Sequence, residues 1–235
     1  PEGFKHALEK ARKKEIPVVV LKAGRTEASA KLAVSHSGAI AGDDAAYRAL
    51  FKRYGVIQVK CIDELAATCQ LLSMEKTIPS GQLAAIMDSG GEREVLMDLA
   101  EEMGVQFAEI EPETIQILGD NLDAGLEPIN PLDAWGTGND YECIYENCLQ
   151  ALVDDKNTGI TLFVADLTSK FWLHETFAKI CQSVAERSHK PVLMMTNHIG
   201  SESQDLALRL QNQGITVLSG TIPTLQAVQH AFNYR

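Results

Sequence analysis

The chain has 235 residues, of which 45% are hydrophobic and 23% are charged, and its formal net charge is −11. This composition is ordinary for a globular protein, but the acidic balance argues against a nucleic-acid partner, because phosphate backbones are bound by basic faces. The sequence contains no apolar run of about eighteen residues, so we expect no membrane span. The five cysteines are odd in number and scattered, which fits a reduced cytoplasmic setting and offers no metal-ligand spacing.

Amphipathic stretches and apolar runs alternate along almost the whole chain. The helical patterns cover Phe4–Lys14, Asp43–Tyr54, Ile62–Leu72, Glu92–Met103, Pro112–Asn121, Tyr141–Val153, Leu173–Arg187, Glu202–Gln213 and Thr224–Phe232. The apolar runs that indicate buried strands are Pro17–Leu21, Val56–Val59, Leu83–Met87, Gly159–Ala165, Pro191–Thr196 and Ile215–Leu218. Such alternation predicts an α/β fold with parallel sheets and flanking helices.

A polar segment that contains Pro79 and Gly81 separates two series of strands and helices. We therefore expect one domain over residues 1–75, a linker over 76–82 and a second domain over 83–235. The first of these has only two strand patterns, too few for an independent doubly wound domain. The sequence predicts that it is the C-terminal part of a larger domain.

A single histidine, His36, lies among small residues between the first strand pattern and the helix expected at Asp43 or Asp44. Small residues let a phosphate or another backbone approach closely. We expect this segment to be a loop, and an accessible imidazole there suits covalent catalysis through a phosphohistidine. Two preceding cations, Lys22 and Arg25, could neutralise phosphoryl charge or could form ion pairs with acidic residues.

The segment KAGRTEASAKLAVSHSGAIAGDDAAY resembles the phosphohistidine loop of the NDP-forming acyl-CoA synthetases, the relatives of succinyl-CoA synthetase. The matched positions are Lys22, Gly24, Arg25, Thr26, Ala33, Ser35, His36, Ser37, Gly38, Ala39, Ala41 and Gly42. The resemblance implies that His36 is the catalytic phosphoryl carrier. It also implies that Ser35, Ser37 and Gly38 contact the phosphate.

The resemblance also implies an arrangement for the complete enzyme. The chain corresponds to the end of one flavodoxin-like domain and to a second, succinyl-CoA-ligase-like one. A CoA-binding domain and an ATP-grasp domain would be partners in the same chain or in another chain. ATP or ADP, CoA and Mg²⁺ would then bind largely outside this chain, a small carboxylic acid would be the substrate, and the enzyme would be a cytoplasmic oligomer.

A turn of Ser89, Gly90 and Gly91 follows a strand pattern and opens a helix. Backbone amides at such a turn attract anions. In the resembled family the matching turn holds the phosphate of the phosphohistidine, although this chain has Glu92 and Arg93 where that family commonly has Pro and Gly. Without the resemblance, the pattern would indicate no more than a tight turn.

The loop over residues 127–138 is rigid and non-helical, because two prolines fix φ and glycines permit unusual turns. It resembles the family's N-P-(V/L)-D loop, which makes Asn130 and Trp135 candidate substrate contacts and Asp133 a candidate catalytic residue. The other interpretation is a structural connection with a buried Trp135.

The residues from Asp166 to Trp172 follow another strand, and ligands of open parallel sheets bind beyond the carboxyl ends of strands. We therefore consider Glu175, just beyond, as a further catalytic candidate. An ordinary loop is the alternative for this segment.

The leading interpretation is an ADP-forming acid–CoA ligase. One variant within the resembled superfamily is an ATP-dependent dimethylsulfoniopropionate lyase, which makes the CoA thioester and then eliminates dimethyl sulfide to leave acryloyl-CoA. Trp135 would suit a sulfonium by cation–π attraction, and Glu175 or Asp133 could remove the α-proton. The rivals are a non-catalytic synthetase-like regulatory module, which typically lacks the histidine, and a plain flavodoxin-like binding module, which leaves the histidine segment unexplained.

Overall fold

A computed structural model describes residues 2–37, 42–168 and 171–235, without the side chains of residues 34, 36 and 37. The helices are α1 (Glu2–Lys13), α2 (Glu27–Ser37), α3 (Asp44–Tyr54), α4 (Ile62–Leu72), α5 (Gly90–Met103), α6 (Pro112–Asn121), α7 (Tyr141–Asp154), α8 (Trp172–Arg187), α9 (Gln204–Asn212) and α10 (Thr221–Tyr234). The strands are β1 (Val19–Leu21), β2 (Ile57–Val59), β3 (Gln82–Met87), β4 (Leu132–Asp133), β5 (Thr158–Val164), β6 (Val192–Thr196) and β7 (Val217–Ser219). Every strand pairing is parallel, which confirms the predicted fold class.

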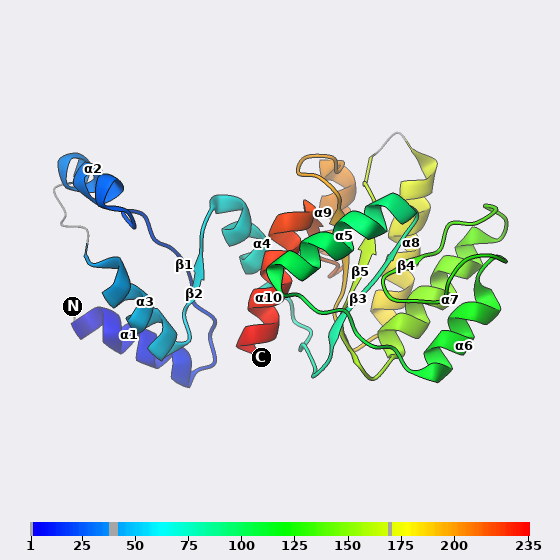
Figure 1. Cartoon of the computed structure of the whole chain (residues 1–235), viewed down its shortest axis with the longest axis horizontal. Coiled ribbons are helices and arrows are strands. Elements are labelled where there is room, and N and C mark those ends of the chain that lie inside the picture. The colour runs from blue at the N-terminus through cyan, green and yellow to red at the C-terminus, as the bar shows by residue number, and fades with distance from the viewer. Residues whose placement is uncertain (1, 38–41, 169–170) are drawn as a thin grey trace.

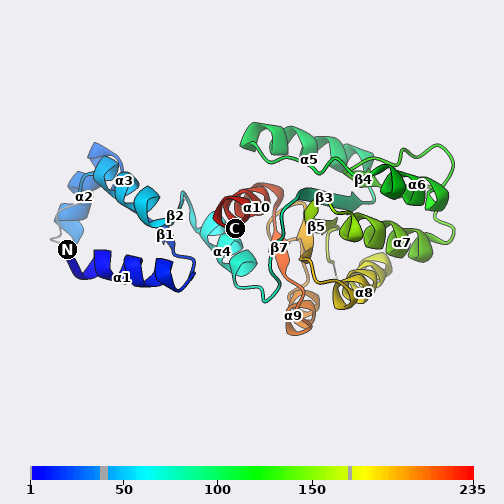
Figure 2. The same ribbon diagram turned by 90° about the horizontal axis from the view of Figure 1, so that it is seen from below.

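The larger sheet has five strands in the order β4-β3-β5-β6-β7. Counted within this sheet alone, the order is 2-1-3-4-5, which is the flavodoxin-like one. Its central strand β5 is buried along its whole length, as expected for a continuous apolar run covered on both faces. One face packs against α6 to α9 and the other against α4, α5 and α10 (Figure 2).

The smaller sheet consists of β1 and β2, paired from Val19 and Ile57 to Leu21 and Val59. A small core of Leu8, Phe51 and Val56 joins α1 and α3 to it. Figure 1 shows these elements with α2 at one end of an elongated molecule, the five-stranded sheet at the other end, and α4 and α10 between them. The two expected strands of the N-terminal part are therefore present.

Helix α4 follows β2 in the chain but contributes to the core of the five-stranded sheet. Ala67 and Leu71 are buried there beside Val228 and Ala231 of α10. A leucine that is 2% exposed contributes about 1.5–3 kcal/mol through burial. The predicted boundary near residue 75 stays a prediction, but the packing of α4 reaches across it.

The histidine segment differs from its prediction as a loop, because α2 extends to Ser37 and includes His36. The reason is local: EASAKLAVSHS contains three alanines with Glu, Lys and Leu, which are good helix formers. Gly38, a predicted phosphate contact, lies outside the described residues. Helix α3 begins as expected, since the Asp43 side chain accepts hydrogen bonds from the amides of Ala45 and Ala46.

Candidate functional site

The strand order places the switch point of the larger sheet between β3 and β5. After β3 the chain forms β4 on one side of it. It then crosses to the other side of β3 and forms β5, β6 and β7 in turn. Ligands of such sheets bind at the carboxyl ends of the strands that flank this point. The predicted turn at Ser89 follows β3 and the predicted segment from Asp166 follows β5, so both lie at this edge.

The turn after β3 is the N-terminus of the 14-residue helix α5. Ser89 is its N-cap, and its Oγ accepts a hydrogen bond from the amide of Glu92 at 3.3 Å. The first amides of a helix have no carbonyl partner within the helix. Gly90 and Gly91 supply such amides, which is the geometry that an anion requires.

Asp133, at the end of β4, lies beside this turn. Its Oδ1 accepts a hydrogen bond from the amide of Trp135 at 3.2 Å. Its Oδ2 would lie 3.1 Å from a β carbon built on Gly90. Asp133 therefore both fixes the start of the Trp135 loop and brings a carboxylate to the predicted phosphate turn.

Carboxylates gather at this edge of the sheet. Burial raises the pKa of Asp88, and the neighbouring charges of Asp133 and Asp166 raise it further. Burial likewise raises the pKa of Glu92, while a hydrogen bond with Asn197 opposes the shift. A phosphate at the Ser89 turn would be repelled by these groups when they are ionised, and protonation of Asp88 would relieve part of that repulsion.

Three aromatic rings form a row next to Asp133. The ring of Tyr141 lies 5.8 Å from Trp135 and 5.8 Å from Trp172, measured between centroids. Trp172 is 62% exposed, whereas Trp135 is half-buried and packs against the core. This aromatic row (Trp135, Tyr141 and Trp172) gives the edge an apolar wall. Sequence analysis did not select Tyr141, although its position six residues after Trp135, at a helix start, was a usable signal.

Glu175 lies one turn after the start of α8, on the same helix as Trp172. Its Oε1 accepts a hydrogen bond from Arg209 at 2.6 Å, and the Glu175 side chain is 43% exposed. The guanidinium would have to move for Glu175 to act as a base. His174, beside it, receives the amide of Thr168 on Nδ1 at 3.0 Å, and burial lowers the pKa of this imidazole.

The residues around His36 are only partly described. The hydroxyl of Ser35 donates to the carbonyl of Leu32 at 2.9 Å, while the side chains of His36 and Ser37 lie outside the described part of the chain. Lys22 lies 3.7 Å from a carboxylate oxygen of Asp44 and 5.1 Å from the centre of the Tyr47 ring. Arg25 is exposed.

The structure does not bring the histidine helix to the Ser89 turn, because α2 lies at the opposite end of the molecule (Figures 1 and 2). Asn130 is also separate from the aromatic row. Its amide nitrogen donates to the carbonyls of Leu83 and Ala108 at 2.9 and 3.0 Å, and its Oδ1 accepts from the amide of Ala85 at 3.0 Å. All three bonds tie the loop to β3 and its neighbour, so Asn130 has a structural role. Its predicted contact with substrate stays untested.

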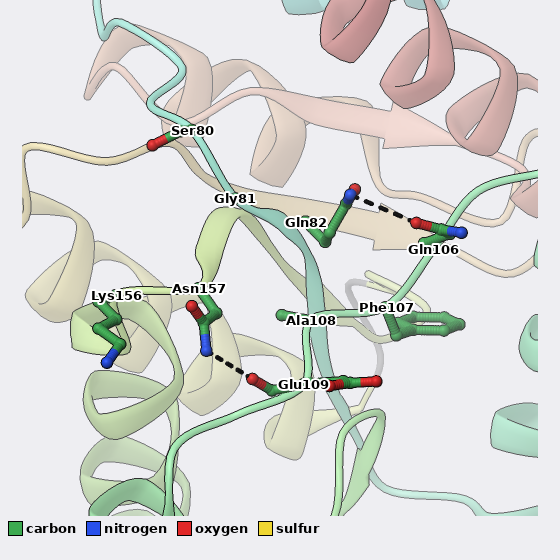
Figure 3. A pocket seen from close by; sticks show the side chains of 9 residues that line it. All are labelled: Ser80, Gly81, Gln82, Gln106, Phe107, Ala108, Glu109, Lys156 and Asn157. Carbon is green, nitrogen blue, oxygen red and sulfur yellow. Dashed lines mark hydrogen bonds between the residues drawn. The ribbon is translucent and has the colours of Figure 1, made fainter.

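A polar cavity of about 720 Å³ lies at the other edge of the sheet, where β3 and β5 begin (Figure 3). Gln82 and Gln106 form a hydrogen bond of 3.4 Å on its wall, and Asn157 donates to the Glu109 carbonyl at 2.7 Å. None of the predicted site residues lines it. Within the described ranges, no three Asp, Glu, His or Cys side chains converge so that they could hold a metal ion, and no described helix is long and apolar enough to cross a membrane.

Comparison with known proteins agrees with the fold and with the family that the histidine segment resembles. Residues 1–72 match the family model of the succinyl-CoA ligase like flavodoxin domain. The chain is 33% identical over 219 residues to the ADP-forming acetate–CoA ligase I of Archaeoglobus fulgidus, which covers 93% of this chain and 30% of that protein. It is 30% identical over 227 residues to the alpha subunit of the ADP-forming acetate–CoA ligase II of Pyrococcus furiosus, covering 91% of this chain and 48% of the subunit.

The fold is also that of a solved structure, the dinucleotide forming acetyl-coenzyme A synthetase 1 of Candidatus Korarchaeum cryptofilum in complex with phosphate and ADP. The TM-score is 0.81 at 24% identity, over 100% of this chain and 51% of that one. The chain thus spans about a third to a half of the length of these relatives. With its histidine segment, its flavodoxin-like strand order and these relatives, the chain belongs to the NDP-forming acyl-CoA synthetase superfamily.

Proposed function

We propose that the complete protein is an ADP-forming acid–CoA ligase in which His36 carries the phosphoryl group. The observation that carries the proposal is the intact segment from Ser35 to Gly42, within a chain that aligns over 93% of its length with an ADP-forming acetate–CoA ligase. A regulatory module would have no need of the histidine. A small carboxylic acid is the proposed substrate class.

In the proposed reaction, a nitrogen of the His36 imidazole takes the γ-phosphoryl group of ATP and ADP leaves. The phosphoryl group then passes to a carboxylate oxygen of the acid, which gives an acyl phosphate. The CoA thiolate attacks the carbonyl carbon of that acyl phosphate and expels inorganic phosphate. The imidazole must be neutral when it attacks, because a protonated ring has no free electron pair.

The second domain would receive the phosphoryl group at the N-terminus of α5. The amides of Gly90 and Gly91 support this role, and the switch point of the sheet is the expected place for it. Transfer requires that α2 and α5 come together, which agrees with a carrier that moves between sites. ATP, CoA and Mg²⁺ would be held by CoA-binding and ATP-grasp domains. Among the described residues, no three Asp, Glu, His or Cys side chains converge where they could hold Mg²⁺.

The test is phosphorylation of the complete protein with labelled ATP and Mg²⁺. Acid-labile, base-stable label is expected in the native protein and in His189→Gln, a control at an exposed histidine. His36→Ala is expected to lose the label and to lose activity by several orders of magnitude, as when a covalent nucleophile is removed. Label retained in His36→Ala would disprove the carrier role.

A dimethylsulfoniopropionate lyase remains the second candidate, and the aromatic row favours it. Aromatic faces attract cations, and the rings of the aromatic row lie side by side at the edge of the sheet where ligands are expected to bind. Asp133 or Glu175 would remove the α-proton. With dimethylsulfoniopropionate, acetate or propionate supplied in turn with ATP and CoA, release of dimethyl sulfide identifies the lyase, and turnover of acetate without it leaves the plain ligase.

A further inference from the structure

One carboxylate joins three elements at the junction between the two sheets. Glu64 lies in the first turn of α4, and its Oε2 accepts a hydrogen bond from the amide of Lys60 at 2.6 Å. Its Oε1 lies 2.9 Å from Nε2 of His230 on α10. Because Lys60 directly follows β2, Glu64 connects the end of the smaller sheet to a helix that covers the larger one.

This contact is shielded from water. The Glu64 side chain is 3% exposed and the His230 side chain is 20% exposed. A buried carboxylate is costly unless its oxygens are hydrogen-bonded, and here each oxygen has a partner. Removal of either His230 or the Lys60 contact would leave a buried charge without that compensation.

The smaller sheet packs against α4, but a gap remains beside this junction. A cavity of about 810 Å³ lies between the two parts, with Ile16 and Ile57 on one side and Met74 and Ile78 on the other. His230 lines the same cavity. Since space separates the first part from the linker and α10 here, its orientation depends on the segment that crosses the junction, which is α4 with its anchored N-terminal turn.

We propose that the Glu64–His230 pair is a positioning contact that fixes the orientation of the part containing β1, β2 and α2 relative to the five-stranded sheet. Ala67 and Leu71 hold α4 onto α10, and the pair holds the turn through which β2 enters α4. The proposal does not depend on the proposed reaction. Loss of the Glu64–His230 contact would affect His36 only by changing the orientation of the part that contains it.

Hydrogen exchange followed by mass spectrometry in the complete protein tests this. Glu64→Ala and His230→Phe are each expected to raise exchange about tenfold in peptides covering β1, β2 and Lys60. Both variants remove the Glu64–His230 contact, and Glu64→Ala also leaves the Lys60 amide without its acceptor. Peptides from β5 and β6 should keep their protection, which shows that the second domain is folded. Glu146→Ala is the matched control, since it removes the exposed Glu146–Arg187 pair at 2.8 Å within the second domain.

The double variant separates a pair from two independent residues. Glu64→Ala with His230→Phe is expected to match Glu64→Ala alone, because one contact is lost once. Glu64→Gln should exchange less than Glu64→Ala, since an amide can accept from Lys60 and donate to Nε2 of the other imidazole tautomer. The proposal would be overturned if the rate increase in the double variant equalled the product of the increases in the two single variants. It would also be overturned if exchange rose only in α4, with β1 and β2 unchanged.

Discussion

The carboxylate of Asp133 occupies the space in which a side chain at Gly90 would lie. A β carbon at Gly90 would meet Asp133 Oδ2 at 3.1 Å, whereas a β carbon at the neighbouring Gly91 would meet nothing within 4 Å. The two adjacent glycines at this helix start therefore differ in their surroundings. The absence of a side chain at Gly90 leaves room for the Asp133 carboxylate, whereas a side chain at Gly91 would extend into open space.

Substitution of the two glycines should give opposite effects on stability. Gly91→Ala should raise the free energy of unfolding by about 0.4–1 kcal/mol, because it reduces the entropy of the unfolded chain. Gly90→Val should lower it by about 1–3 kcal/mol, since Asp133 must be displaced. Gly90→Val should also impair the proposed phosphoryl transfer in the complete protein. Urea denaturation of both variants measures the difference, and equal shifts would show that Asp133 moves freely.

Asp88 should make stability depend on pH. Burial and neighbouring carboxylates raise the pKa of Asp88 in the folded state, so its protonated form stabilises the fold relative to its ionised form. This stabilisation is fully present below the unfolded pKa of about 3.9 and is lost as pH rises through the folded pKa. Asp88→Asn should therefore raise the free energy of unfolding more at about pH 7 than at about pH 3.5. Asp98→Asn, on the exposed face of α5, is the control in denaturation at both pH values.

Asn130 should be a stability residue. Asn130→Ala removes three hydrogen bonds to the backbone around β3, and we expect a loss of about 2–3 kcal/mol in the free energy of unfolding. Asn139→Ala, in the exposed part of the same region, should stay within about 0.5 kcal/mol of the native protein. A native-like melting curve for Asn130→Ala would contradict the structural role.

Trp135 should distinguish cationic from neutral acids. If the substrate is a sulfonium acid, Trp135→Ala should lose roughly 1–2 kcal/mol of binding, and Trp135→Phe should keep part of it. A short neutral acid should show little difference between the two variants. Calorimetric titration with dimethylsulfoniopropionate and with propionate gives the comparison, and equal losses for both acids would remove the cation–π role.

Much of the fold was predictable because its signals are local. Nine helices and six strands follow from periodicity. Gly55 and Gly104 end their helices with φ of 67° and 69°, the left-handed conformation that is usual for C′ glycines. Helix α2 was not predicted, because its small residues and His36 suggested a loop. β4 has only two residues and depends on pairing with β3.

The candidate site was predictable only in part. The Ser89 turn and the Asp166 segment follow strands, so their place at one edge comes directly from parallel topology. The three bonds of Asn130 span 22 to 47 residues, and the approach of Asp133 to Gly90 brings the end of β4 to the start of α5. Such contacts depend on the packed fold, which periodicity does not specify.

The position of α4 has a consequence for how this protein can be divided or recombined. The family model ends at residue 72, yet Ala67 and Leu71 fill the core beneath the five-stranded sheet. A gene fragment that begins at the linker would leave the surfaces of α10 and β7 uncovered, and we expect that product to aggregate or to need α4 supplied as a separate peptide. An exchange of homologous modules between relatives would have to keep α4 with the second domain. The end of the family model at residue 72 is therefore not a boundary at which the folded protein can be cut.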